Sequence, residues 1–216
     1  MRTLKLFLAA TAVFMSVAAS AQFEGSKQVY HAPDYKETLE THKIVAILPF
    51  KATISYKRLP KGFDAAANSE EEKKLGTNMQ QGMYTYLLRK EGKYSVTFQD
   101  VDRTNVLLKQ AGVFDNIDVM LPDSLAKILK VDAVIKCSYA YEKTSSEGGA
   151  IAKTVLLGSF AGKTAAGALT MQIYNGSNGT LLWRFYKEMN ENVTSSASEV
   201  MERMMRKVSR NFPYEK

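Results

Sequence analysis

The apolar run from Lys43 to Phe50, KIVAILPF, places the strongest constraint on what this chain can fold into. It is almost continuously apolar and is ended by Pro49, which is typical of a strand that is covered on both faces. A strand of this kind belongs in the middle of a sheet. The sequence therefore predicts a layered domain organised around residues 43–50.

Strand and helix patterns alternate after this run. Residues 51–67 have the composition of a loop, and Ser69-Glu-Glu-Glu72 forms a capping box before a helix that ends at Gly92. The apolar stripe of this helix consists of Leu75, Met79, Met83 and Leu87. A strand at 94–99, a helix ending at Gly112, a short helix opened by Pro122 and a strand at 131–141 follow. This alternation predicts parallel strands joined by helical crossovers.

The carboxy-terminal part has a different pattern. Apolar residues alternate with polar ones before and after the turn Asn175-Gly-Ser-Asn-Gly179, which indicates an antiparallel hairpin. A last helix over 196–211 has an apolar side that we expect in the core, formed by Met201, Met204, Met205, Val208 and Phe212. Together the patterns predict a three-layer α/β domain. Its mixed sheet has about five strands, three of them parallel and then an antiparallel hairpin, flanked by about four helices.

The amino terminus has the pattern of a signal peptide. Arg2 and Lys5 precede an apolar run of about ten residues, too short to span a bilayer as a helix, and small residues follow up to Ala21. We expect cleavage after residue 21, a polar amino-terminal arm at 22–42, and a single α/β domain at 43–216. An uncleaved anchor is the alternative. No cysteine lies near the cleavage site for a lipid anchor, so we expect a periplasmic or secreted protein.

Charge and cysteine content narrow the function classes. Loss of Arg2 and Lys5 lowers the formal charge from +7 to +5, which is mildly basic. Nucleic acid is a poor candidate in an exported protein, and contact with an anionic surface would be weak and screened by salt. The single cysteine, Cys137, alternates with apolar residues along a strand, so we expect a buried structural thiol rather than a nucleophile or an intermolecular bridge.

Motifs for catalysis or cofactors are incomplete. Gly158-Ser-Phe-Ala-Gly-Lys-Thr164 resembles a phosphate-binding loop, but it has three residues between the first glycine and Gly-Lys-Thr where that loop needs four. The two histidines, His31 and His42, have no cysteine or carboxylate at a recognisable ligand spacing, and we expect both on the surface. The sequence predicts no nucleotide, no metal, no cofactor and no catalytic residue.

A Gly- and Ala-rich insertion at 143–168 separates two predicted strands. One interpretation is a connection that packs on the domain. The other is a segment that binds a partner or enters a membrane, because long inserted loops in compact domains often have a task. Its predicted contact residues are Ile151, Val155, Leu156, Leu157 and Phe160. Residues 150–168 contain two lysines and no uncharged run of 18 residues, which excludes a spanning helix.

The order of three segments resembles the TolB amino-terminal-domain-like superfamily. These segments are Ile44–Phe50, Leu125–Lys136 and Leu169–Trp183. The superfamily includes curli secretion-channel subunits and activator lipoproteins of penicillin-binding proteins. The resemblance implies a non-enzymatic protein that works by contact with envelope partners or by assembly. The chain departs from many relatives in lacking a lipidation cysteine, and from the channel branch in having one short insertion where a membrane hairpin would lie.

These observations together favour a non-catalytic, exported cell-envelope protein that acts through protein–protein contacts, as a scaffold or regulator. We expect an envelope protein as partner, with a homo-oligomer and peripheral membrane contact as further options. A subunit of an oligomeric outer-membrane secretion channel and an enzyme of unrecognised type are the alternatives. A deep polar pocket would favour the enzyme.

Overall fold

A computed structural model describes residues 27–143, 165–191 and 197–216 of the chain, with the side chains of 165, 166 and 189–191 left out. The strands are β1 (Lys27–His31), β2 (Ile44–Ile47), β3 (Lys51–Tyr56), β4 (Thr97–Phe98), β5 (Ala133–Lys143), β6 (Ala165–Asn175) and β7 (Leu181–Glu191). The helices are α2 (Tyr35–Glu40), α3 (Ala65–Leu88), α4 (Val101–Gln110), α5 (Pro122–Leu129) and α7 (Ala197–Val208). Three 3₁₀ turns, η2 (Glu91–Lys93), η3 (Phe114–Asn116) and η5 (Ser209–Asn211), complete the described elements.

All seven strands belong to one mixed sheet, which confirms the predicted α/β class. Its order is β1-β7-β6-β5-β2-β4, and β3 also pairs with β5. The strands β5, β6 and β7 form an antiparallel meander, and β1 extends it antiparallel to β7. The strands β2 and β3 pair in parallel with successive halves of β5, and β4 is parallel to β2. The 43–50 run therefore lies inside the sheet, as its pattern predicts.

Two strands and one helix arise from segments without a strong apolar pattern. The strand β1 and the helix α2 lie within the segment predicted as a polar arm, and β3 lies within the predicted loop 51–67. Both strands pair on one side only among the described residues. An edge strand with one wet face needs few apolar residues, which explains why the pattern missed them.

The helix α3 begins four residues before the predicted capping box. The carboxylate of Asp64 accepts hydrogen bonds from the backbone N–H groups of Ala66 at 2.8 Å and Ala67 at 3.3 Å. This is the role of an N-cap residue, so Asp64 and not Ser69 starts the helix. Glu72 instead reaches back to β3, where its Oε1 accepts from the N–H of Ile54 at 2.7 Å.

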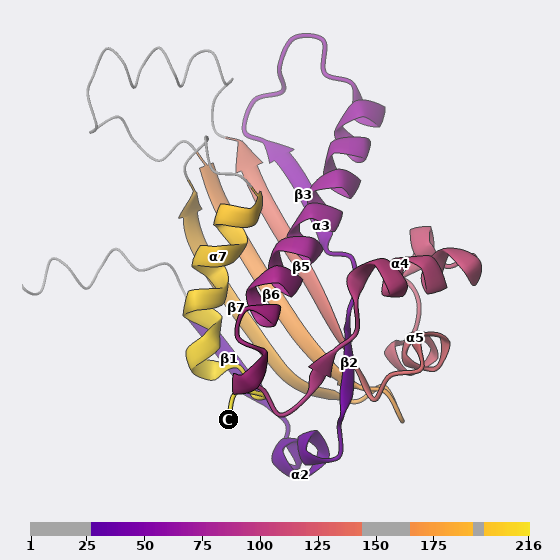
Figure 1. Ribbon diagram of the computed structural model, residues 1–216. Coiled ribbons are helices and arrows are strands. Elements are labelled where there is room, and N and C mark those ends of the chain that lie inside the picture. Colours follow the sequence, from indigo (N-terminus) through magenta and orange to yellow (C-terminus); the bar gives the residue numbers. More distant parts are fainter. Residues whose placement is uncertain (1–26, 144–164, 192–196) are drawn as a thin grey trace, which may run out of the picture.

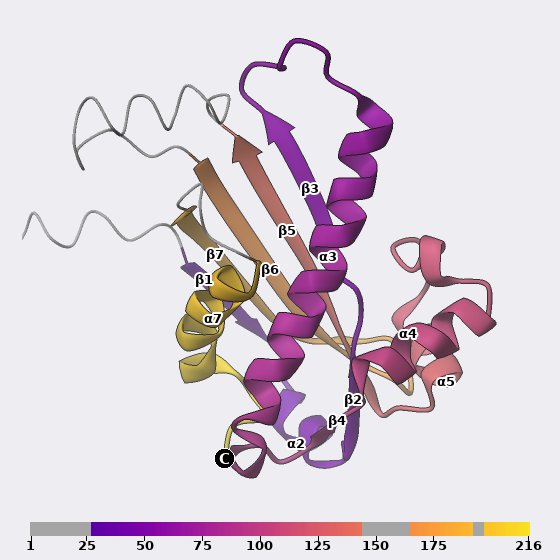
Figure 2. The same cartoon turned by 45° about the horizontal axis from the view of Figure 1, so that its top comes forward.

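Helices α3 and α7 lie side by side on one face of the sheet (Figures 1 and 2). They pack on the larger of two apolar clusters, and the predicted apolar side of α7 is buried there. Cys137 is in the same cluster, where burial raises the pKa of its thiol, as expected for an inert structural cysteine.

Helices α4 and α5 cover the opposite face over β2 and the first part of β5, with Leu108, Leu125 and Leu129 in the second cluster. The predicted third layer is therefore present at this end of the sheet. Farther along, the same face carries half-exposed residues such as Lys136, Gln172 and Arg184, which are paired in register, and no described helix lies over them.

Candidate binding surfaces

The connection between α4 and α5 is a compact series of turns. Gly112 ends α4 with a φ of 68°, a conformation that suits glycine. The N–H of Val113 then donates to the carbonyl of Leu108 at 3.0 Å, and that of Asn116 to the carbonyl of Val113 at 2.9 Å. Val119 continues the series by donating to Asn116 at 3.1 Å. The backbone of this loop is thus held by its own hydrogen bonds.

Two lysines fasten the same loop to the sheet. The Nζ of Lys136 donates to the carbonyl oxygens of Ile117 at 3.2 Å and Asp118 at 3.0 Å. Burial lowers the pKa of Lys136, and the carboxylate of Asp118 partly offsets that effect. Lys51 lies 3.3 Å from the Asp118 carboxylate, and Ile117 is buried beneath the loop. The loop therefore has one defined position on the sheet.

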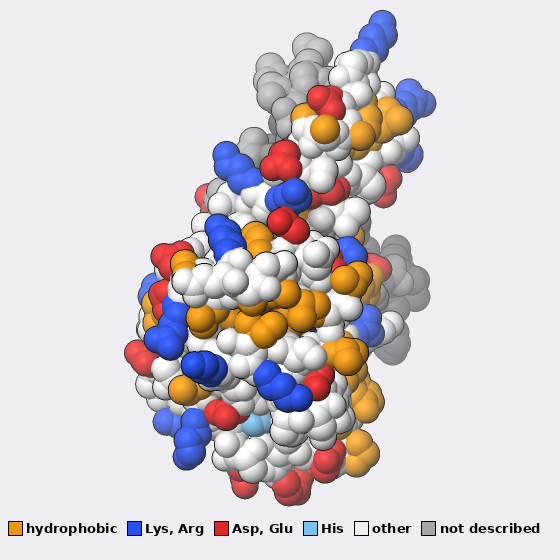
Figure 3. Space-filling view, turned by 90° about the vertical axis from the view of Figure 1, so that its right-hand side faces the viewer, with side chains coloured by type: hydrophobic (Ala, Val, Ile, Leu, Met, Phe, Trp, Pro, Cys, Tyr) orange, Lys and Arg blue, Asp and Glu red, His pale blue; other side chains and the backbone are white. Residues whose placement is uncertain are grey.

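Apolar side chains point outward from this fixed loop. Val119 is 84% exposed and Leu121 is 68% exposed, and Val106 on the outer side of α4 is 50% exposed. Figure 3 shows apolar side chains gathered on this side of the molecule. We call the set Val106, Val113, Phe114, Val119 and Leu121 the α4–α5 patch, in which Val113 and Phe114 are half-buried. Exposed apolar side chains on one side of a molecule are typical of contact sites.

A pocket of about 510 Å³ lies at the end of the sheet where β2 begins, between α2, Ser95 and the carboxy-terminal segment. Many of its lining side chains are polar or charged. Its lining is formed by His31, Tyr35, Lys36, Leu39, Glu40, His42, Ser95, Arg210, Asn211, Phe212, Pro213 and Glu215. Both histidines of the chain therefore meet at one site, which the sequence did not predict.

The prediction that His42 lies on the surface is wrong, because this side chain is only 5% exposed. Its Nδ1 lies 2.8 Å from the hydroxyl of Tyr214, and its Nε2 has no hydrogen-bond partner among the described residues. Burial lowers the pKa of His42, and the nearby Asn175 amide and Asp132 carboxylate oppose that effect. Burial is the largest of these effects, so the fold favours the neutral form of the ring.

The surroundings of His42 have the character of a structural network. The Oδ2 of Asp132 accepts from the backbone N–H groups of Lys43 at 2.8 Å and Ile44 at 2.9 Å. Burial raises the pKa of Asp132, but these two bonds together with the charge interactions of His42 and Lys43 outweigh it and leave the pKa below its ordinary value. The hydroxyl of Ser95 donates to the carbonyl of Tyr214 at 3.4 Å, and no hydrogen bond joins it to His42. The pocket therefore lacks a serine poised on a histidine base.

Acidification is expected to weaken the fold through His42. Its folded pKa lies below the ordinary value of 6.5, so the unfolded chain takes up a proton first as the pH falls. Stability is then complete above 6.5 and is lost as the pH falls towards the folded pKa. We expect the melting temperature to fall between about pH 7.5 and pH 5.5, and to fall less in His42→Gln. Equal pH dependence in the two proteins would contradict this role of His42.

The described residues contain neither a metal-binding cluster nor a membrane-spanning helix. Within 27–143, 165–191 and 197–216, no three His, Cys, Asp or Glu side chains gather as they would around a metal ion. None of the described helices has the length and hydrophobicity to cross a membrane.

The predicted contact residues Ile151, Val155, Leu156, Leu157 and Phe160 lie outside the described residues, as does the Gly158–Thr164 loop. The sequence analysis also missed the α4–α5 patch. A signal for it exists in the run Val119-Met-Leu121, which stands between Asp118 and the helix-opening Pro122. Three apolar residues in a turn-rich segment have no place in a helical stripe or a strand.

Comparisons with known proteins give structural likeness only. No protein-family profile matches the sequence, and no curated protein matches it significantly. Solved structures with a similar fold include lipoprotein GNA1162 from Neisseria meningitidis, with 14% identity, a TM-score of 0.44, and coverage of 78% of this chain and 95% of that one. PelC from Paraburkholderia phytofirmans, described as a dodecamer, has 14% identity, a TM-score of 0.42, and coverage of 89% and 99%. The carboxy-terminal domain of LpoB from Salmonella enterica has 12% identity, a TM-score of 0.34, and coverage of 74% and 94%. At this level the likeness does not extend to function or assembly.

Proposed function

We propose that the chain is an exported, non-catalytic cell-envelope protein that acts by binding another protein. The observation that supports this most is the α4–α5 patch, where Val119 and Leu121 are presented to solvent by a loop that is fastened to the sheet. The signal peptide predicted at 1–21 supports the location. The insertion residues predicted at 151–160 remain part of the proposal as a second contact.

The patch is suited to binding because its geometry is set in advance. Burying a Val or Leu side chain that was exposed contributes about 1.5–3 kcal/mol, so two such anchors supply a useful share of an interface. A loop that already has one conformation loses little entropy when a partner orders it. Val119 and Leu121 contribute little to the core, because they are exposed and Ile117 is the residue of this loop that is buried.

The test is site-specific photo-crosslinking in the bacterium that produces the chain. A photoreactive residue in place of Val119 is expected to give one discrete adduct with a second protein. The same residue in place of Glu37, which is exposed on α2 and lies outside the α4–α5 patch, is the matched control and is expected to give none. Val106→Asp combined with Leu121→Asp is expected to reduce the adduct by at least about tenfold without lowering the melting temperature.

Other outcomes separate the alternatives. An adduct with the mass of two copies of this chain would contradict the proposal that the partner is a different protein. It would favour self-assembly, including the secretion-channel alternative. Equal labelling from positions 119 and 37 would remove the support that the α4–α5 patch gives. Residues 151–160 would then be the one proposed contact region left for a partner.

A further inference from the structure

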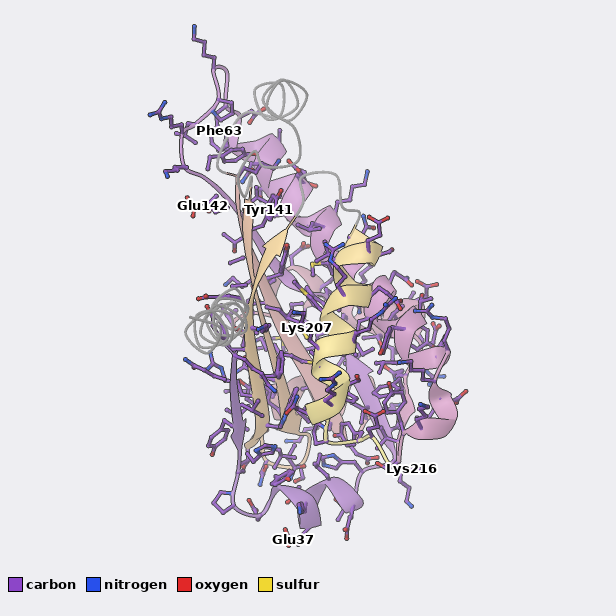
Figure 4. All side chains as sticks on the ribbon, turned by 90° about the vertical axis from the view of Figure 1, so that its left-hand side faces the viewer. Glu37, Phe63, Tyr141, Glu142, Lys207 and Lys216 are labelled. Atoms are coloured by element: carbon purple, nitrogen blue, oxygen red, sulfur yellow. The ribbon has the colours of Figure 1, made fainter. Side chains whose placement is uncertain are left out.

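The loop between β3 and α3 projects beyond the end of the sheet (Figure 1). We call residues 57–63 the β3–α3 tip, with the sequence Lys57-Arg-Leu-Pro-Lys-Gly-Phe63. Figure 4 shows Phe63 at the end of the molecule far from Glu37 and Lys216. The tip can therefore approach a flat surface without contact by α2 or the carboxy-terminal segment.

The tip carries three cations and no acid. Lys57, Arg58 and Lys61 are all exposed, and none of them has an ion-pair partner among the described residues. The nearest acid in sequence, Asp64, is occupied in capping α3. None of the three cations is therefore paired with a carboxylate of the described residues, and Asp64 adds one negative charge directly after the tip.

Two large apolar side chains accompany these cations, Leu59 between Arg58 and Lys61 and Phe63 after Lys61. Leu59 is 67% exposed and Phe63 is 36% exposed. The tip is an ordered turn, because the N–H of Phe63 donates to the carbonyl of Pro60 at 3.2 Å and Gly62 has a φ of 76°. The Phe63 ring packs edge-on against Tyr56, with 5.5 Å between the ring centroids. Leu59 is the apolar residue left without such support.

From this combination we propose that the β3–α3 tip binds the surface of lipid bilayers that contain anionic phospholipids. Cations near an anionic bilayer contribute about 1 kcal/mol each, and an apolar side chain that enters the interface adds a separate contribution. A solvated polyanion would bind the cations but has no apolar environment in which Leu59 could be buried. A bilayer uses both, which is why the exposed Leu59 favours it.

The first experiment is sedimentation of residues 22–216, which contain every described element, with vesicles of equal parts phosphatidylcholine and phosphatidylglycerol. The triple variant Lys57→Gln, Arg58→Gln, Lys61→Gln is expected to lose about a hundredfold in affinity at low salt. The matched control is Lys36→Gln, Arg210→Gln, Lys216→Gln, which removes the same charge at the opposite end. It is expected to lose less than about threefold, and both variants should melt like the parent.

The second experiment tests whether residue 59 enters the bilayer interface. Leu59→Trp is expected to give a blue-shifted emission with the mixed vesicles and not with phosphatidylcholine alone, against the constant signal of the buried Trp183. Equal losses in the two triple variants would overturn the proposal, because net charge would then explain the binding. Binding to polyphosphate as tight as to vesicles, with no shift at position 59, would also overturn it and identify a soluble polyanion. These readouts do not involve the α4–α5 patch, so either proposal can fail alone.

Discussion

Replacing Gly76 by alanine is expected to destabilise the protein by about 3 kcal/mol, although the residue lies in the middle of the helix α3. A Cβ at this position would lie 2.2 Å from the carbonyl oxygen of Phe50 and 3.2 Å from its carbonyl carbon. These are backbone atoms of the β2–β3 junction, and the N–H of Phe50 also donates to the carbonyl of Gly76 at 3.4 Å. Helix propensity alone predicts the opposite sign, a gain of about 1 kcal/mol.

The measurement is the free energy of unfolding in denaturant. Gly92→Ala is the matched control, because a Cβ there meets nothing within 4 Å, and it is expected to change stability by less than about 1 kcal/mol. If Gly76→Ala were as stable as the parent, α3 would have to pack farther from the β2–β3 junction than the structure places it.

The apolar stripe of α3 could be predicted from the sequence, whereas its close contact with Phe50 could not. In the predicted stripe, Met79, Met83 and Leu87 are fully buried and Leu75 is partly buried, because period and apolarity are properties of the helix itself. The close approach at Gly76 depends on where a strand junction lies in space. A single glycine in a helical pattern carries no sign of that neighbour.

The edge strand β3 shows a second kind of limit. Its central residue Ile54 has an outward N–H that donates to Glu72, and its carbonyl accepts from the amide of Asn68 at 3.4 Å. These side chains satisfy the backbone groups that a neighbouring strand would otherwise pair. In the sequence both residues have the polarity of an exposed first helical turn, so their tertiary role is invisible there.

The candidate sites were predictable only in part for the same reason. The environment of His42 is made by Tyr214, 172 residues along the chain, so its burial could not be inferred from its polar neighbours. The run Val119-Met-Leu121 is a sequence signal for part of the α4–α5 patch, but its exposure depends on Lys136 holding the loop from β5. Local patterns predict elements, whereas exposure is decided by long-range contacts.

Phe212→Ala is expected to destabilise the protein by about 4 kcal/mol. The side chain is 3% exposed and follows the last helix, where a terminal residue would usually contribute little. Its ring lies within 6.3 Å, centroid to centroid, of the rings of Phe98, Trp183, Tyr94 and Tyr214. Phe98 belongs to β4 at one edge of the sheet and Trp183 to β7 near the other, so this single ring joins strands that never pair with each other.

The same denaturant titration tests this prediction, with Phe63→Ala as the control. Phe63 is 36% exposed and has one ring neighbour, Tyr56, so its loss is expected to change stability by less than about 1 kcal/mol. Deleting residues 212–216 should exceed Phe212→Ala, because it also removes the hydrogen bonds from Ser95 N–H to the Tyr214 carbonyl at 2.9 Å and from Lys216 N–H to the Lys93 carbonyl at 2.8 Å. If the deletion were no worse than Phe63→Ala, the carboxy-terminal segment would be an accessory to the core. The aromatic cluster would then have to hold β4 without it.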